Sequence, residues 1–233
     1  RTPRGLVFPP DRSIHERPDY VKTRETFGEW EGDLMIFERA QGKMNVASLV
    51  ERKTRFAVLF RNNDRSSTHL MNTLMNVMEP LLQTVRRSIT FDRGFEFREW
   101  RKLKSGIGTE SWFCDPQAPW QKGSVENLNK RARRYLPRDT QLAALSNRNI
   151  QAICERLNGT PRKCHGWKTP AEVFREEIIK LRYRKTSQRS LNQHFSPVSL
   201  RKSCAARSSN ARNTIRQPKF TVQTIEIVFF VPG

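Results

Sequence analysis

The chain has 233 residues and carries 43 Lys and Arg against 23 Asp and Glu, which gives a formal net charge of +20. A balance this basic indicates a polyanionic partner, with nucleic acid ahead of an acidic membrane surface. No apolar run approaches the ~20 residues of a membrane span and no signal-peptide core follows the N-terminus, so we expect no membrane partner.

The N-terminal residues 1–28 are polar and proline-rich, which predicts an irregular leader. The pattern changes after Trp30, where short apolar runs begin. Three of them predict buried strands: Gly32–Phe37, Val46–Val50 and Phe56–Phe60. The polar segment Glu51–Arg55 between the last two suits a hairpin.

The hydrophobic period then switches to that of a helix. Ser66–Thr68 offers an N-cap, and apolar residues from Leu70 to Leu82 follow at helical spacing, which favours a core-facing helix over a Met-rich binding face. Further elements are predicted in this order: a strand Ser88–Phe91, a helix Glu96–Lys104, a strand Trp112–Cys114, a loop Asp115–Pro119, and helices Ser124–Tyr135, Arg148–Leu157 and Pro170–Arg182.

Three strands followed by alternating helices and strands predict an α/β domain over 29–183, with one mixed sheet and helices on its faces. Residues 184–233 differ, since they are rich in Ser, Asn, Arg and Gln and lack periodicity until Thr221–Val231. We interpret them as an atypical basic tail with the composition of a disordered segment, in which Thr221–Val231 is at most an isolated strand.

The four cysteines are Cys114, Cys154, Cys164 and Cys204. None forms a Cys-x-x-Cys pair, and a structural zinc site needs four ligands at suitable spacings. We therefore favour reduced, structural thiols of a cytoplasmic protein over a zinc site.

Three acidic residues stand out by position. Asp33 lies within an apolar strand, Asp92 directly follows a strand and precedes a glycine turn, and Glu126 lies in the first turn of a helix. Taken singly, a buried ion pair, a turn-stabilising Asp and a helix-dipole Glu explain them. Taken together, the first and fourth strands can be neighbours in a mixed sheet, and the helix can bring a third carboxylate beside them. A divalent cation would relieve their repulsion, and two such ions can support phosphoryl transfer.

Basic residues crowd around Glu126, and Lys130 with Arg133 or Arg134 lies at helical spacing from it. A phosphate backbone could follow that stripe, while the alternative is a solvated basic helix that pairs with acids elsewhere. The candidates for DNA contact are Lys122, Lys130, Arg131, Arg133, Arg134 and Arg138.

At these residues the sequence resembles the DDE transposases of the insertion-sequence-thirty family, which are relatives of the retroviral-type integrase core. The resemblance covers roughly residues 14–180, and the 33 residues between Asp92 and Glu126 match the family's spacing. Seven ordered blocks carry it: Trp30–Leu34, Leu49–Arg55, Thr90–Gly94, Phe113–Pro116, Pro119–Asn127, Leu157–Lys163 and Gly166–Phe174.

The resemblance implies a ribonuclease-H-like, mixed five-stranded sheet with helices on both faces. It implies that Asp33, Asp92 and Glu126 bind two Mg²⁺ or Mn²⁺ ions and cut and join DNA strands. The implied partners are element ends and target DNA, bound by a homo-oligomer assembled on DNA in the bacterial cytoplasm, at the nucleoid. Arg93 and Trp120 join the candidate DNA contacts.

Departures from the family pattern are Arg93 where Gln is usual, Val125 where Asn is common, and His165 where Leu is common. The family's N-terminal helix-turn-helix region is missing and the chain begins without Met, as a fragment would. With the unfamiliar tail, this argues against autonomous transposition. Two rival hypotheses are a non-catalytic nucleic-acid-binding remnant and a ribonuclease-H-like nuclease. The intact triad speaks against the first, and the blocks around Trp120 and Trp167 speak against the second.

Overall fold

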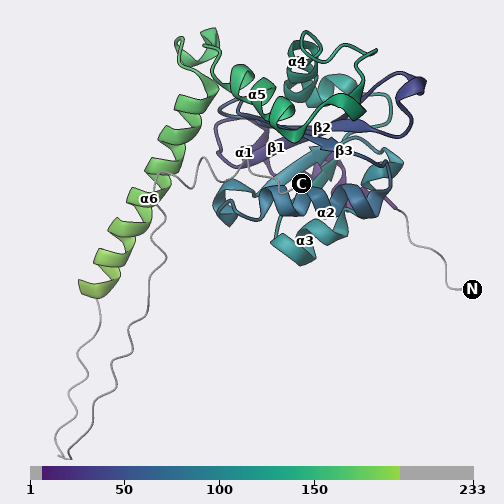
Figure 1. Ribbon diagram of the computed structural model, residues 1–233. Coiled ribbons are helices and arrows are strands. Elements are labelled where there is room, and N and C mark those ends of the chain that lie inside the picture. Colours follow the sequence, from purple (N-terminus) through teal and green to yellow (C-terminus); the bar gives the residue numbers. More distant parts are fainter. Residues whose placement is uncertain (1–6, 195–233) are drawn as a thin grey trace, which may run out of the picture.

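A computed structural model describes residues 7–194 of the chain, and residues 1–6 and 195–233 lie outside it. Cys204 and the predicted strand Thr221–Val231 are therefore outside the described residues. Within them, the architecture is a central sheet with helices above and below, and one long helix that projects from the body (Figure 1).

The sheet has five strands in the order β3-β2-β1-β4-β5. Strand β1 pairs antiparallel with β2, which pairs antiparallel with β3, whereas β1–β4 and β4–β5 are parallel. The sheet is therefore mixed, as the order of predicted elements indicated. The strands are β1 (Glu29–Ile36), β2 (Asn45–Glu51), β3 (Ala57–Asn62), β4 (Ser88–Phe91) and β5 (Glu110–Phe113).

Helices cover both faces of the sheet, which confirms the predicted fold class. Figure 1 shows α2 and α3 on one face and α4 and α5 on the other, and each face has its own apolar core. The α-helices are α1 (Asp19–Lys22), α2 (Ser67–Met78), α3 (Arg101–Ile107), α4 (Gly123–Ala132), α5 (Asn147–Asn158) and α6 (Pro170–His194). None of the helices in residues 7–194 combines the length and apolar composition needed to cross a membrane.

Successive side chains of β1 alternate between the two apolar cores. Trp30 and Leu34 face the core under α2 and α3, and Met35 faces the core under α4 and α5. Gly32 lets β4 approach closely, because a Cβ atom there would lie 2.5 Å from the ring of Phe91. The close contact holds β1 and β4 together beside the residues that follow them.

The predicted helix Glu96–Lys104 is divided in the structure. A 3₁₀ turn spans Phe95–Phe97 and α3 begins only at Arg101. Phe97 and Trp100 are both buried in the same core. Residues three apart eclipse each other in 3₁₀ geometry, so the tighter turn brings both rings to the same side.

The described part of the leader contains only short helical turns and packs against the sheet beyond β5. The indole Nε1 of Trp100 donates to the carbonyl of Val7 at 2.9 Å, and the rings of Phe8 and Phe113 lie 4.6 Å apart. The leader also reaches β4, where Arg17 Nη1 donates to Thr90 Oγ1 at 3.1 Å. Residues 7–28 thus contribute buried contacts to the core domain.

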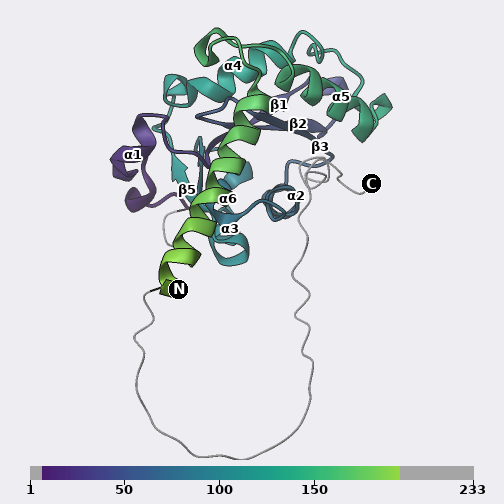
Figure 2. The same cartoon turned by 90° about the vertical axis from the view of Figure 1, so that its left-hand side faces the viewer.

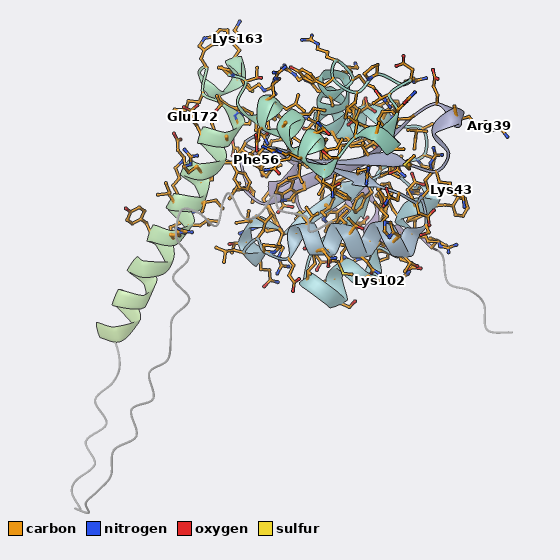
Figure 3. All side chains as sticks on the ribbon, in the orientation of Figure 1. Arg39, Lys43, Phe56, Lys102, Lys163 and Glu172 are labelled. Atoms are coloured by element: carbon orange, nitrogen blue, oxygen red, sulfur yellow. The ribbon has the colours of Figure 1, made fainter. Side chains whose placement is uncertain are left out.

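The last helix, α6, is anchored by its first turns. Phe174 stacks on Phe56 at 4.2 Å and contacts the ring of Phe27 at 5.1 Å. Figure 3 shows Phe56 near the junction between the sheet and α6. The remainder of α6 extends away from the body in Figure 1 and crosses in front of it in Figure 2. The helix continues to His194, past the boundary at 183 expected from sequence, while the proposed division into a core and a tail stays a prediction.

Candidate active site

Three carboxylates from separate elements line one cavity of about 310 Å³. They are Asp33 in β1, Asp92 at the end of β4 and Glu126 in α4. The sheet register explains the meeting of the first two, because Glu31 pairs with Thr90 and each aspartate lies two residues further along its strand. The convergence that the sequence left open is thus present.

Glu31 attaches α4 to the sheet. Its side chain is fully buried, and its Oε2 accepts hydrogen bonds from the backbone N–H groups of Ser124 at 2.8 Å and Val125 at 3.0 Å. Its Oε1 accepts from Arg52 Nε at 3.0 Å. A carboxylate at a helix N-terminus satisfies free amides and interacts favourably with the helix dipole. Glu31 therefore holds the helix that carries Glu126, a role the sequence analysis missed although Glu31 shares the strand face of Asp33.

Lys122 joins two of the carboxylates. Its Nζ lies 2.8 Å from Asp33 Oδ1 and 2.6 Å from Asp92 Oδ2, and only 6% of its side chain is exposed. Burial by itself lowers the pKa of Lys122, but the charges and hydrogen bonds of the two aspartates outweigh it and raise the pKa above its ordinary value. The ammonium is therefore charged and neutralises part of the carboxylate cluster.

The oxygen of each aspartate that Lys122 does not bind accepts a hydrogen bond from a neutral group. The N–H of Gly94 donates to Asp92 Oδ1 at 3.0 Å, and Asn129 Nδ2 donates to Asp33 Oδ2 at 2.9 Å. The amide oxygen of Asn129 is buried and has no hydrogen-bond partner among the described residues. Within that part of the chain, the carboxylate of Glu126 also makes no hydrogen bond or ion pair.

The cavity suits a cation, although in residues 7–194 no group of three His, Cys, Asp or Glu side chains is arranged to hold a metal ion as it stands. Asp33 and Asp92 already share one cation, the Lys122 ammonium. Glu126 and the Asn129 amide oxygen add unpaired oxygen acceptors. Oxygen donors of this kind are those that Mg²⁺ and Mn²⁺ prefer.

Asp115 and Cys114 also line this cavity. Asp115, predicted as a turn residue, accepts from Gln121 Nε2 at 2.8 Å and lies 2.7 Å from His15 Nε2. The Gln121 hydrogen bond, followed by His15, lowers the pKa of Asp115. Burial raises the pKa of the Cys114 thiol to about 12, so it stays protonated. Cys114 and Cys154 are buried free thiols and Cys164 is an exposed one, and no zinc site forms among the described cysteines.

The predicted DNA contacts fall into two groups. Trp120, Lys130, Arg134 and Arg138 are exposed, and Trp120 is exposed to 74%. Arg93 is exposed as well, but like the remaining three it is engaged within the protein. Lys122 binds the aspartates, Arg93 Nε donates to the Cys114 carbonyl at 3.0 Å, Arg133 Nη2 donates to the Ile36 carbonyl at 2.6 Å, and Arg131 lines a second cavity.

Comparisons with known proteins identify relatives of the chain. The chain is 35% identical over 177 residues to the transposase for insertion sequence element IS1086 of Cupriavidus metallidurans, a match covering 76% of this chain and 52% of that protein. It is 34% identical over 165 residues to the transposase InsI for element IS30C of Escherichia coli K12, covering 71% and 42% of the two chains. No family model matches the chain.

Among solved structures, the catalytic core domain of BIV integrase matches with a TM-score of 0.50 at 17% identity, covering 66% of this chain and 97% of that one. A chain of the simian T-cell lymphotropic virus intasome complex matches with a TM-score of 0.51 at 14% identity, covering 79% and 60%. These likenesses show the fold, which is ribonuclease-H-like. The predicted resemblance to insertion-sequence-thirty transposases is confirmed, and the chain spans about half the length of those relatives.

Proposed function

We propose that this chain, a relative of the insertion-sequence-thirty transposases, contains a catalytic core that cuts and joins DNA strands by metal-dependent phosphoryl transfer. The observation that carries the proposal is the meeting of Asp33, Asp92 and Glu126 in one cavity. The 35% identity to a transposase and the integrase-like fold support it. The basic charge of +20 suits a DNA partner.

Asp33, Asp92 and Glu126 would hold Mg²⁺ or Mn²⁺, two ions in all. When bound, such ions activate an attacking oxygen and stabilise the leaving oxygen of a phosphodiester. The chain's own residues fix the carboxylates for this task. Gly94 donates to one oxygen of Asp92, and Asn129 donates to one oxygen of Asp33. The other oxygen of each aspartate binds Lys122, which holds the two carboxylates together in the absence of metal.

DNA is the proposed partner, both as element ends and as target. The exposed residues Trp120 and Lys130 flank Glu126 in sequence, and Lys130 is four residues after Glu126, on its face of α4. Arg134 and Arg138 continue the exposed basic surface. Assembly of several copies on DNA belongs to the same proposal.

A strand-transfer assay with a pre-cut DNA end and Mg²⁺ tests the proposal. Asp33→Asn, Asp92→Asn and Glu126→Gln are each expected to abolish the joined product while DNA binding persists, because the carboxylates serve the metals and the basic residues serve the backbone. Their effects should be non-additive, since the three act as a unit. Glu79→Gln, an exposed acid at the end of α2, is the matched control and should retain activity.

Asp115→Ala probes the fourth acid of the cavity. Its carboxylate is already bound by Gln121 and His15, so we expect at most a modest loss of product. Wild-type protein that binds DNA but never yields product would instead support a non-catalytic remnant. Cleavage restricted to RNA–DNA hybrids would support a ribonuclease-H-like nuclease.

A further inference from the structure

A second cavity, of about 340 Å³, lies beside α4 and is lined by arginines. Arg24, Arg55, Arg131 and Arg162 come from four separate segments of the chain. Ser124 and Asn127 add polar groups to the wall, and no carboxylate is among the described residues that line it. The cavity therefore concentrates positive charge without a counter-charge of its own.

The first turns of α4 separate this arginine cavity from the carboxylate cavity. Lys122 and Glu126 line the carboxylate cavity, and their sequence neighbours Gly123 and Asn127 line the arginine cavity. An α-helix with its side chains is roughly 10 Å across, which sets the separation of the two cavities. Each strand of double-stranded DNA carries one charge per ~3.4 Å of the helix axis, so a strand at the carboxylates has further phosphates roughly 10 Å away.

The guanidinium groups have unused hydrogen-bonding capacity. Arg24 makes no side-chain hydrogen bond or ion pair with the described residues. Arg55 Nη1 donates to Ser124 Oγ at 2.6 Å, and Arg131 Nε donates to Asn127 Oδ1 at 3.2 Å. Neither contact neutralises a charge, and each guanidinium keeps donors free because it has five.

Arg162 gives the most direct indication of a missing ligand. Its residue is 9% exposed, and its Nη2 donates to the Leu157 carbonyl at 3.0 Å. Its Nη1 is buried and has no hydrogen-bond partner among the described residues. A buried donor of a charged group is costly to leave unpaired, and the residue that carries it lines the cavity.

The electrostatics of Arg55 agree with an unfilled anion site. Burial first, and the charge of Arg24 second, lower the pKa of Arg55. Cys164, which also lines the cavity, and then Glu31 act on the pKa of Arg55 in the opposite direction, and the Glu31 carboxylate is already bound to Arg52 and to the N-terminus of α4. Arg24 and Arg55 therefore repel each other across the cavity, and an anion would reduce that repulsion.

Two of these arginines also occupy backbone positions that favour glycine. The φ angles of Arg24 and Arg55 are 62° and 61°, in the left-handed region. Arginine there costs on the order of 1 kcal/mol relative to an unstrained position. Such positions are found preferentially at functional sites, and both side chains here line the same cavity.

We propose that the arginine cavity binds a phosphate group of the DNA backbone, at a point separate from the carboxylate site. Guanidinium groups bind phosphate through paired, charge-assisted hydrogen bonds, and four of them with the Ser124 hydroxyl suit one such group. The choice of DNA as the source of the phosphate rests on the proposed function. The presence of an anion site does not, because it follows from the arginines themselves.

The double variant Arg24→Gly/Arg55→Gly tests the site, because glycine fits both left-handed positions and the fold should be kept. Its matched control is Arg98→Gln/Arg148→Gln, which removes two exposed positive charges outside the cavity. In the first measurement, inorganic phosphate is titrated at constant ionic strength against chloride. Phosphate should raise the Tm of wild type and of the control, and the rise should be lost in the glycine variant.

The second measurement is the salt dependence of binding to a DNA duplex, followed by fluorescence anisotropy without divalent metal. Loss of one phosphate contact should reduce the slope of log K against log salt by about 1 in the glycine variant, relative to the control variant. A rise in Tm with phosphate that persists in the glycine variant would overturn the site. Loss of that rise with an unchanged DNA slope would overturn DNA as its ligand, in favour of a free phosphate.

Failure of the two proposals is distinguishable. Neither measurement needs strand transfer, because the first uses phosphate alone and the second uses DNA without divalent metal. A chain that shows the phosphate effect and the slope change yet yields no joined product would retain the arginine site and lose the transposase proposal. A chain that joins DNA but shows neither effect would retain the transposase proposal and lose the arginine site.

Discussion

Replacement of Lys122 by methionine tests how the carboxylate cavity is stabilised with and without a bound metal ion. Methionine keeps the length of the buried stem and removes the ammonium that joins Asp33 to Asp92. Without metal, the two aspartates then lose their shared counter-charge and repel. With metal, the oxygens released by the ammonium become available to the cation.

The expected loss of stability without metal is about 2 kcal/mol. A hydrogen bond to a charged group contributes ~1.5–3 kcal/mol, and Asp33 supplies one such bond. The Asp92 bond counts for less, because 40% of that side chain is exposed and solvent screens the pair. Relief of Lys122 burial works in the opposite direction. For a chain of this size, 2 kcal/mol corresponds to a fall in Tm of roughly 4–8 °C.

The assay is thermal unfolding of wild type and Lys122→Met, with and without Mg²⁺ at equal ionic strength. Mg²⁺ at 100 times its Kd stabilises a free site by ~2.7 kcal/mol. In wild type the ion must also displace the ammonium, so its net stabilisation should be smaller by about 2 kcal/mol, the value estimated for the Lys122 contacts. Lys168→Met is the control, since Lys168 forms only an exposed pair with Glu176 and should change neither quantity by more than ~0.5 kcal/mol.

An equal Mg²⁺-induced rise in Tm for wild type and Lys122→Met would refute the reasoning. It would mean that the ammonium and the metal do not compete for the same aspartate oxygens. A smaller rise in the variant would refute it more strongly, because Lys122 would then assist metal binding.

Three further outcomes are expected. Glu31→Gln should cost about 3 kcal/mol in urea unfolding and speed hydrogen exchange at the Ser124 and Val125 amides, because one amide oxygen cannot serve both Arg52 and α4; unchanged exchange would refute this anchor. Phe174→Ala should lower the free energy of unfolding by about 3–5 kcal/mol in the same assay, through lost packing on Phe56. Tyr183→Ala, at a side chain exposed to 72%, should lower it by less than ~0.5 kcal/mol. Equal losses would contradict the docking of α6. For Glu177, burial alone raises the pKa, but its bonds to Lys180 and Lys53 outweigh burial and lower the pKa. The carboxylate therefore stabilises the fold above the unfolded pKa of ~4.3, and this stabilisation is lost as pH falls through the folded pKa. The Tm difference between wild type and Glu177→Gln should shrink from pH 7 to about pH 3, and a constant difference would contradict the assignment.

The sequence predicts the sheet well because each strand has a local signal. Apolar runs bounded by polar turns identify β1 to β5, and β4 begins and ends at the predicted residues Ser88 and Phe91. The helix before β5 is less well predicted, because the choice between 3₁₀ and α geometry at Phe97 depends on where the core accepts the ring. That information is absent from the local pattern.

The carboxylate cavity is predicted as a set of three acids but without its neutralising partner. The basic stretch around Lys122 predicts a DNA contact, whereas the fold turns Lys122 inward onto Asp33 and Asp92. That orientation depends on a 3₁₀ turn, Pro119–Lys122, immediately before α4. The arginine cavity is further from prediction, since it combines segments from residue 24 to residue 162 that only the tertiary fold brings together.

Glu31 and Asp33 show why residue type alone does not assign a role at this site. They are two residues apart in β1 and therefore face the same side of the sheet. Glu31 meets the N-terminus of α4 and Arg52, so both of its oxygens are occupied by fixed donors. Asp33 lines the cavity, where its partners are the Asn129 amide and the Lys122 ammonium. The sheet register thus gives the two carboxylates different partners, and this difference is the basis for proposing metal binding by Asp33 and helix anchoring by Glu31.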